Sequence, residues 1–264
     1  MTASAPAPNP PVLPVLAPAG PGWRLWRLAA VLMLGFASGL PLALTGQAMQ
    51  AWLSLEGIDV ATIGFLSLVG LPYTFKFLWA PLMDRFDPPW LGRRRGWLVL
   101  TQLLLAGALL LMAGTSPKES MRLYALLAVA IAFLSASQDV VIDAYRTDLL
   151  PAPERGLGAS LSVLGYRLAM ILSGGIALIW TDPVNAGGPA GWTWPEVYRL
   201  MALLMVAAAG VSALLLPRLP RLERPESVAR NDLIGFAAVL AAAAVGYLLT
   251  DRVLGPLSST LLGP

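Results

Sequence analysis

Runs of about 20 mostly apolar residues recur along this 264-residue chain, separated by charged or Gly/Pro-rich breaks. An α-helix of that length spans the ~30 Å hydrocarbon core of a bilayer. The runs therefore predict an all-α integral membrane protein. Seven spans are expected, at residues 28–50, 60–83, 97–114, 122–145, 157–180, 197–216 and 233–250.

The composition excludes a soluble protein. Charged residues make up 12% of the chain and hydrophobic residues 57%, and the mean hydropathy is +0.69. Typical globular domains contain ~25% charged residues, so this chain has too little polar material to cover a globule. The net charge of +3 comes from short basic clusters between the spans, which we interpret as membrane-flanking charge and not as a nucleic-acid site.

The chain contains no Cys and no His. Disulfides, thiolate chemistry, zinc sites and the usual proton shuttle at neutral pH are therefore excluded. Because a phosphate-binding Gly loop followed by Lys is also missing, the sequence predicts no enzyme activity, no catalytic residue, no metal and no cofactor. Any proton chemistry falls to carboxylates.

The distribution of Lys and Arg predicts a cytoplasmic N-terminus, because basic residues concentrate in cytoplasmic loops. With the N-terminus inside, twelve basic residues lie in the inner segments and four in the outer ones. The inner residues are Arg24, Arg27, Arg85, Arg93, Arg94, Arg95, Arg146, Arg155, Arg218, Arg221, Arg224 and Arg230, and the outer ones are Lys118, Arg122, Arg199 and Arg252.

Four segments organise the chain. Residues 1–22 form a Pro/Ala-rich tract that we expect to be a disordered cytoplasmic tail and not a signal peptide. Residues 23–216 are expected to form a six-helix unit, residues 217–232 a charged cytoplasmic linker, and residues 233–264 the seventh transmembrane helix and the C-terminal end. In the outer loop before the sixth span, Trp192 and Trp194 are candidates for membrane-interface anchors.

Charged side chains are unevenly distributed among the spans. The third span and residues 200–216 of the sixth span carry none, whereas spans two, four and five contain Lys76, Asp139, Asp143 and Arg167. An ionisable group in hydrocarbon costs about 2.5–3.5 kcal/mol on insertion scales, so such groups face a bundle interior or a water-filled cavity. We expect spans three and six to form outer scaffold, and spans one, two, four and five to form the cavity wall.

The fourth span places Ser135, Asp139, Asp143 and Arg146 on one helix face, at spacings of four, four and three residues. Two carboxylates one turn apart repel each other, which favours a site that takes up a proton. A fixed network is the alternative, with Lys76 or Arg167 neutralising Asp139 and Arg146 neutralising Asp143. We assign proton coupling or gating to Asp139, Asp143 and Lys76, and both interpretations remain open.

The substrate-binding candidates are polar or planar groups within the spans. Arg167 lies near the middle of the fifth span and suits a substrate carboxylate or an internal one equally well. Gln47 and Gln50 lie near the outer end of the first span, where the alternative is an interhelical hydrogen bond. The complete candidate set is Arg167, Gln47, Gln50, Gln138 and Tyr166.

Small residues and proline interrupt the first span. Gly35 and Gly39 form a GxxxG pair that permits close helix approach, and Pro41 can bend the helix. A Gly/Pro-interrupted span can line a site in transporters, but packing alone explains it at least as well.

Charges crowd the inner loop between the second and third spans. Asp84 and Arg85 end one span, and Gly92 precedes Arg93, Arg94 and Arg95. This loop predicts a cytoplasmic latch between helices; positive-inside topology is the plain alternative. The predicted latch consists of Asp84, Arg85, Gly92, Arg93, Arg94 and Arg146.

This loop resembles the signature between helices two and three of the major facilitator superfamily, in which Gly precedes Asp-Arg and Gly-Arg-Arg follows. Ala80 replaces that Gly here, and six residues separate Arg85 from Gly92 instead of about one. The resemblance implies a six-helix N-terminal bundle of 3+3 inverted repeats and alternating access between two such halves.

A more specific resemblance is to the AmpG-type muropeptide permeases of that superfamily. It is carried by 35-GFASGLPLAL-44, 76-KFLWAPLMDR-85, 92-GRRRGW-97 and 137-SQDVVIDAYRTDLL-150. It implies proton symport of anhydro-muropeptides across the bacterial inner membrane during peptidoglycan recycling. By position it makes Asp139 and Asp143 the proton or gating carboxylates, and Asp84, Arg85 and Arg94 the inner latch.

Members of this family have about twelve spans, whereas about seven are predicted in this chain. The resemblance thus implies a missing C-terminal half or a second copy as partner, besides the bilayer, the solute and protons. Alternatives are a carrier of acyl-CoA or another large anion, and a non-transporting fragment or sensor.

Overall fold

The computed structural model describes residues 20–86, 88, 91–182, 191–217 and 219, together with scattered helical positions between 234 and 252. The chain divides into two compact units, Met1–Leu219 and Pro220–Pro264. The predicted tail, linker and seventh span lie wholly or largely outside the described residues. The following description concerns the first unit.

This unit consists of helices. They are α1 (Pro21–Thr45), α2 (Gln47–Leu55), α3 (Val60–Leu66), the 3₁₀ helix η1 (Ser67–Gly70), α4 (Leu71–Phe75), the 3₁₀ helix η2 (Lys76–Leu78), α5 (Ala80–Arg85), α6 (Arg93–Ala113), α7 (Met121–Leu149), the 3₁₀ helix η3 (Ala152–Glu154), α8 (Arg155–Met170), the π-helix η4 (Ile171–Ile176), α9 (Ala177–Thr181) and α10 (Trp194–Leu214).

Within the described residues, six helical stretches are long and apolar enough to cross a membrane. They match the first six predicted spans. Their bounds are Gly22–Leu55, Val60–Leu78, Arg93–Ala113, Met121–Leu149, Ala152–Thr181 and Trp194–Leu214. Since a helix satisfies its own backbone hydrogen bonds, such stretches can cross the hydrocarbon core.

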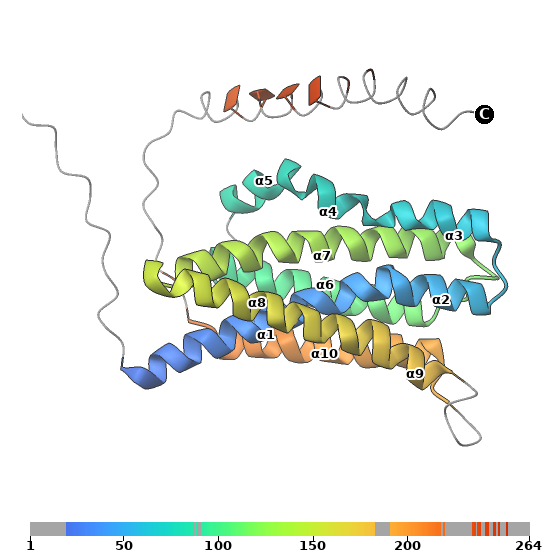
Figure 1. Cartoon of the computed structure of the whole chain (residues 1–264), viewed down its shortest axis with the longest axis horizontal. Coiled ribbons are helices and arrows are strands. Elements are labelled where there is room, and N and C mark those ends of the chain that lie inside the picture. The colour runs from blue at the N-terminus through green and yellow to red at the C-terminus, as the bar shows by residue number, and fades with distance from the viewer. Residues whose placement is uncertain are drawn as a thin grey trace, which may run out of the picture. The chain divides into compact units, whose positions relative to one another are not determined.

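The helix termini at the two ends of the bundle, which can be followed in Figure 1, carry different side chains. We call one the arginine-rich end; it contains the start of α1, the start of α6 and the junction between α7 and α8. The other is the aromatic end, where the Trp52 ring lies 5.4 Å from Tyr124, 6.3 Å from Trp194 and 5.2 Å from Tyr198. The Tyr198 hydroxyl donates a 2.6 Å hydrogen bond to the carbonyl of Leu44, which anchors α10 to α1.

The two tryptophans predicted as interface anchors have different environments. Trp192 is 43% exposed and stacks on Trp180 at 4.9 Å. Trp194 is only 6% exposed and packs inside the aromatic cluster. The anchor prediction was therefore wrong for Trp194, because the first turn of α10 directs this side chain into the core.

α1 and α6 organise the packing. α1 packs along α8 and α7, and α6 lies against both α7 and α10. α6 and α10, whose charged residues lie only near their N-terminal ends, thus pair with each other. The second span contributes least to the core, since only 11% of its apolar window is buried.

Close contact between α1 and α8 depends on glycine. A Cβ on Gly35 would overlap the backbone of Ser162, and one on Gly39 would overlap the Tyr166 carbonyl. On the α8 side of the contact, a Cβ on Gly165 would overlap the Leu32 carbonyl of α1. The predicted close approach at the GxxxG pair is confirmed, because each helix lacks side-chain atoms where the backbones meet.

The second span is not one regular helix, in contrast to the continuous run predicted over 60–83. It begins at Asp59, whose carboxylate accepts a 2.9 Å hydrogen bond from the Thr62 backbone N–H and a 2.6 Å bond from the Thr62 hydroxyl. These bonds lower the pKa of Asp59. The helix is then interrupted by 3₁₀ turns around Gly70 and Lys76, next to Pro72 and Pro81, whose missing N–H groups break the α-helical ladder.

Candidate functional site

Asp139 lies at the centre of a polar contact between three spans. The hydroxyl of Ser38 in α1 donates a hydrogen bond to Asp139 Oδ1. From the second span, Lys76 Nζ lies 3.8 Å from Asp139 Oδ2. The Asp139 side chain is 12% exposed, so its charge requires such compensation. Lys76, and not Arg167, is therefore the partner that neutralises Asp139.

Asp139 lines a cavity of about 310 Å³ among α1, α7 and α8. Asp143 and Arg146 lie one and two turns further along α7 and share its face, as their spacing predicts. Their side chains pair at 3.1 Å between Arg146 Nη2 and Asp143 Oδ1. The complete lining is Ser38, Asp139, Ile142, Asp143, Arg146, Ser162, Val163 and Tyr166. The cavity presents carboxylates, a guanidinium and hydroxyls, groups that bind a polar solute.

The structure brings one substrate-binding candidate to this cavity and leaves four outside it. Tyr166 is part of the lining. Arg167, the next residue, is exposed on another face of α8, although its mid-span position suggested burial. Gln138 is fully buried and its amide has no hydrogen-bond partner among the described residues, so a solute does not reach it in this conformation. Gln47 and Gln50 lie in α2 at the aromatic end.

Arg94 is the centre of the predicted latch. Its guanidinium bridges two carboxylates, Asp84 at the end of the second span and Asp148 in α7, the latter at 2.9 Å. Arg93 donates a 3.3 Å hydrogen bond to the Asp84 carbonyl. Gly92 precedes α6 with φ of 80°, a conformation that favours glycine. These contacts join spans two, three and four at the arginine-rich end.

Two members of the predicted latch lie apart from this contact. Arg146 pairs with Asp143 in the cavity wall. It lies on the cavity face of α7, apart from the Arg94 contact, and its role in the latch stays a prediction. Arg85 is exposed in the last turn of α5.

A second ionic contact at the same end was not predicted. Glu154, in the junction between α7 and α8, accepts a hydrogen bond from Arg27 at 3.0 Å and forms a salt bridge with Arg24 at 3.2 Å. Arg27 is only 6% exposed. This contact ties the start of α1 to the start of α8, close to the glycine-mediated packing of the two helices.

Sequence reasoning missed three partner residues: Ser38, Asp148 and Glu154. Ser38 lies between Gly39 and Gly35 in a stretch with a strong packing signal, and its hydroxyl was the only polar group there. Asp148 follows the predicted fourth span and lies on a different face of α7 from Asp139 and Asp143. A search for compensating partners of each buried charge would have favoured both.

We expect Arg94→Lys to lower the free energy of unfolding by about 1–3 kcal/mol, because an ammonium group cannot bridge both carboxylates in the same geometry. The measurement is denaturant unfolding of the purified protein in detergent micelles. Arg122→Lys, an exposed position at the aromatic end, is the matched control. Equal stability of the two variants would contradict a structural role for the bridge.

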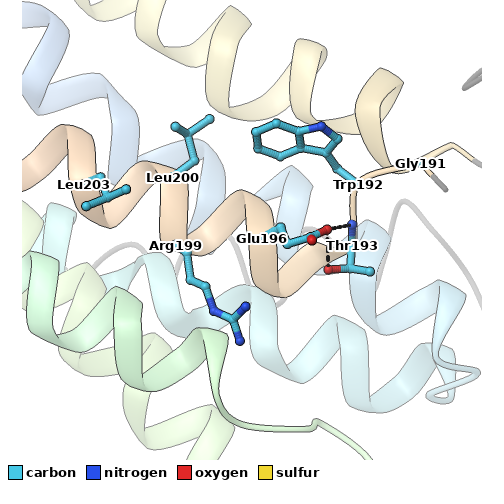
Figure 2. Close-up of a pocket in the computed structure, with 7 residues that line it drawn as sticks. All are labelled: Gly191, Trp192, Thr193, Glu196, Arg199, Leu200 and Leu203. Atoms are coloured by element: carbon cyan, nitrogen blue, oxygen red, sulfur yellow. Dashed lines mark hydrogen bonds between the residues drawn. The ribbon is translucent and has the colours of Figure 1, made fainter.

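A larger cavity of about 500 Å³ lies at the start of α10 (Figure 2). Its lining is Gly191, Trp192, Thr193, Glu196, Arg199, Leu200 and Leu203. Glu196 is held in a capping box, accepting from the Thr193 backbone N–H at 2.7 Å and from its hydroxyl at 2.9 Å. None of the predicted site residues lies here, so we place the functional site at Asp139.

The fold and the cavity define a multi-pass helical membrane protein with charged residues gathered inside a six-helix bundle. The sequence profile described as Major Facilitator Superfamily matches residues 28–263. The chain belongs to this superfamily.

Three relatives show where the similarity lies. The chain is 55% identical over 192 residues to the anhydromuropeptide permease of Escherichia coli K12, an alignment covering 72% of this chain and 37% of the relative. It is 37% identical over 193 residues to an uncharacterised protein of Haemophilus influenzae, covering 73% and 43%. It is 31% identical over 186 residues to the putative transporter AmpG 4 of Rickettsia conorii, covering 69% and 44%. The chain thus spans less than half the length of these relatives.

Proposed function

We propose that this chain forms one six-helix half of a proton-coupled permease that imports anhydro-muropeptides. The observation that carries the proposal is Asp139, a carboxylate held by Ser38 and Lys76 at the edge of a polar cavity. The 55% identity to an anhydromuropeptide permease supports the substrate class.

Protonation of Asp139 is the proposed coupling step. When ionised, Asp139 pairs with Lys76 and holds the second span against α7. Uptake of a proton removes the negative charge and with it the attraction to Lys76, which frees the second span to move. A proton can therefore shift the balance between two conformations, because it binds them with different affinity.

The solute would meet the remaining polar groups of the cavity. Arg146 offers a guanidinium suited to a solute carboxylate, and Tyr166 and Ser162 offer hydroxyls suited to sugar. Asp143 competes with the solute for Arg146, since the two already pair. Binding of an anionic solute would thus release Asp143 and couple solute binding to charge in the cavity.

The proposed location is the bacterial inner membrane, with the N-terminus and the arginine-rich end in the cytoplasm. Basic side chains cluster at that end of the bundle, as the positive-inside rule requires. The proposed partner is a second six-helix half or a second copy of this chain, because alternating access in this fold needs two halves around one site.

Uptake of labelled anhydro-muropeptide by cells that carry the full-length gene tests the proposal. We expect uptake that rises with an inward proton gradient and that unlabelled anhydro-muropeptide inhibits. Labelled acyl-CoA, tested in parallel, should not accumulate. Accumulation of acyl-CoA alone would show that the substrate is an acyl-CoA and not an anhydro-muropeptide. No uptake of either compound despite stable membrane insertion would favour a non-transporting protein.

A further inference from the structure

Two buried hydroxyls lie beside Asp139. They are the Tyr73 hydroxyl in α4 and the Ser135 hydroxyl in α7, and neither has a hydrogen-bond partner within the described residues. The Tyr73 hydroxyl lies within interaction range of Asp139, Ser135 and Thr45. A buried hydroxyl without a partner costs about 1–3 kcal/mol, so packing alone does not explain a pair of them at one place.

Both hydroxyls lie on the side of Asp139 opposite the cavity. The second span and α7 run in the same direction, from the aromatic end to the arginine-rich end (Figure 1). Ser135 precedes Asp139 by one turn and Tyr73 precedes Lys76 by three residues, so both lie toward the aromatic end. Asp143 and Arg146, which line the cavity, follow Asp139 toward the arginine-rich end. Asp139 therefore separates the cavity from the hydroxyl pair.

We propose that Tyr73 and Ser135 pass protons between the aromatic end of the bundle and Asp139. This inference rests on the proposed function, in which Asp139 takes up the proton. A hydroxyl both donates and accepts, so Tyr73 can give its proton to the Asp139 carboxylate while it receives one from Ser135 or from water. Each hydroxyl ends the step neutral, and one proton has moved from water to the carboxylate.

The charged and titratable groups around Asp139 fit this direction of transfer. Lys76 Nζ lies 3.8 Å from Oδ2 of the carboxylate that would accept the proton, and the Ser38 hydroxyl donates a hydrogen bond to Oδ1. The arginine and the second carboxylate of the cavity lie on the far side. The groups that face Asp139 are Ser38 from α1, Tyr73 from α4, Lys76 from η2, Asp143 and Arg146 from α7, and Tyr166 from α8.

The test follows protonation of Asp139 directly and needs no substrate. The full-length protein is reconstituted in vesicles, the pH on the side of the aromatic end is lowered rapidly, and the infrared band of the protonated carboxyl is recorded over time. Loss of this band in Asp139→Asn assigns it. Tyr73→Phe and Ser135→Ala are expected to slow its appearance about tenfold, the factor that corresponds to one lost hydrogen-bonded link. Ser135→Thr, which keeps the hydroxyl, should restore the rate.

The chain offers matched controls for both substitutions. Tyr124 and Ser212 also carry buried hydroxyls that have no partner in the described part of the chain, but Tyr124 belongs to the aromatic cluster and Ser212 lies in α10. Tyr124→Phe and Ser212→Ala should leave the rate unchanged. Equal rates in all four variants, or equal slowing in all four, would overturn the proton route and leave the function of Asp139 intact. A band that persists in Asp139→Asn would overturn both.

Discussion

Replacement of Asp139 by Asn is expected to reduce proton-driven uptake by about a hundredfold or more and to remove its dependence on external pH, because an amide cannot exchange the coupled proton. The amide keeps the size of the side chain and can still accept the hydrogen bond of Ser38, so the cavity should keep its shape. Initial rates of labelled anhydro-muropeptide uptake over a range of external pH measure the effect.

The control for this substitution is Asp59→Asn, the same chemical change at an exposed helix N-cap where Asn is equally suitable. It should leave both rate and pH dependence unchanged. Because Asp139→Asn leaves Lys76 without its partner, the double variant with Lys76→Gln separates misfolding from lost coupling. We expect the double variant to be as stable as the wild type but as inactive in uptake as Asp139→Asn. Unaltered uptake and pH dependence in Asp139→Asn would remove this residue from the proposed mechanism.

Gly35→Ala is expected to destabilise the bundle by about 1–3 kcal/mol or more, although alanine is the better helix former. The added methyl group would overlap the backbone of Ser162, and backbone atoms cannot move aside as a flexible side chain can. α1 and α8 would have to separate, which also strains the Arg27–Glu154 contact between them. Denaturant unfolding in detergent micelles measures the loss.

Gly107→Ala in the middle of α6 provides the opposite expectation. No atom lies within 4 Å of a Cβ at this position, so the substitution should leave stability unchanged or raise it slightly. A similar effect of both substitutions would show that close contact between α1 and α8 does not depend on Gly35.

The sequence predicted charged residues of the spans that belong to the candidate site. It identified Lys76, Asp139 and Asp143 as candidates because a charged side chain within a span is energetically costly. The structure places the two aspartates in the lining of one cavity and Lys76 in contact with Asp139. Arg167 and Gln138 were also polar groups within spans, yet one is exposed and the other is buried without a partner. Depth along the chain could be read from the sequence, but the direction of each side chain around its helix could not.

The class of protein and the positions of six spans follow from the amino-acid sequence alone. Each span satisfies its own backbone hydrogen bonds, so length and apolar composition are sufficient to predict it. Which charged groups contact each other depends on how the helices pack. Ser38 and Asp139 are 101 residues apart, and their hydrogen bond depends on the rotation and register of α1 against α7. Those are set by contacts between helices, such as the glycine surfaces of α1 and α8, which no single span contains.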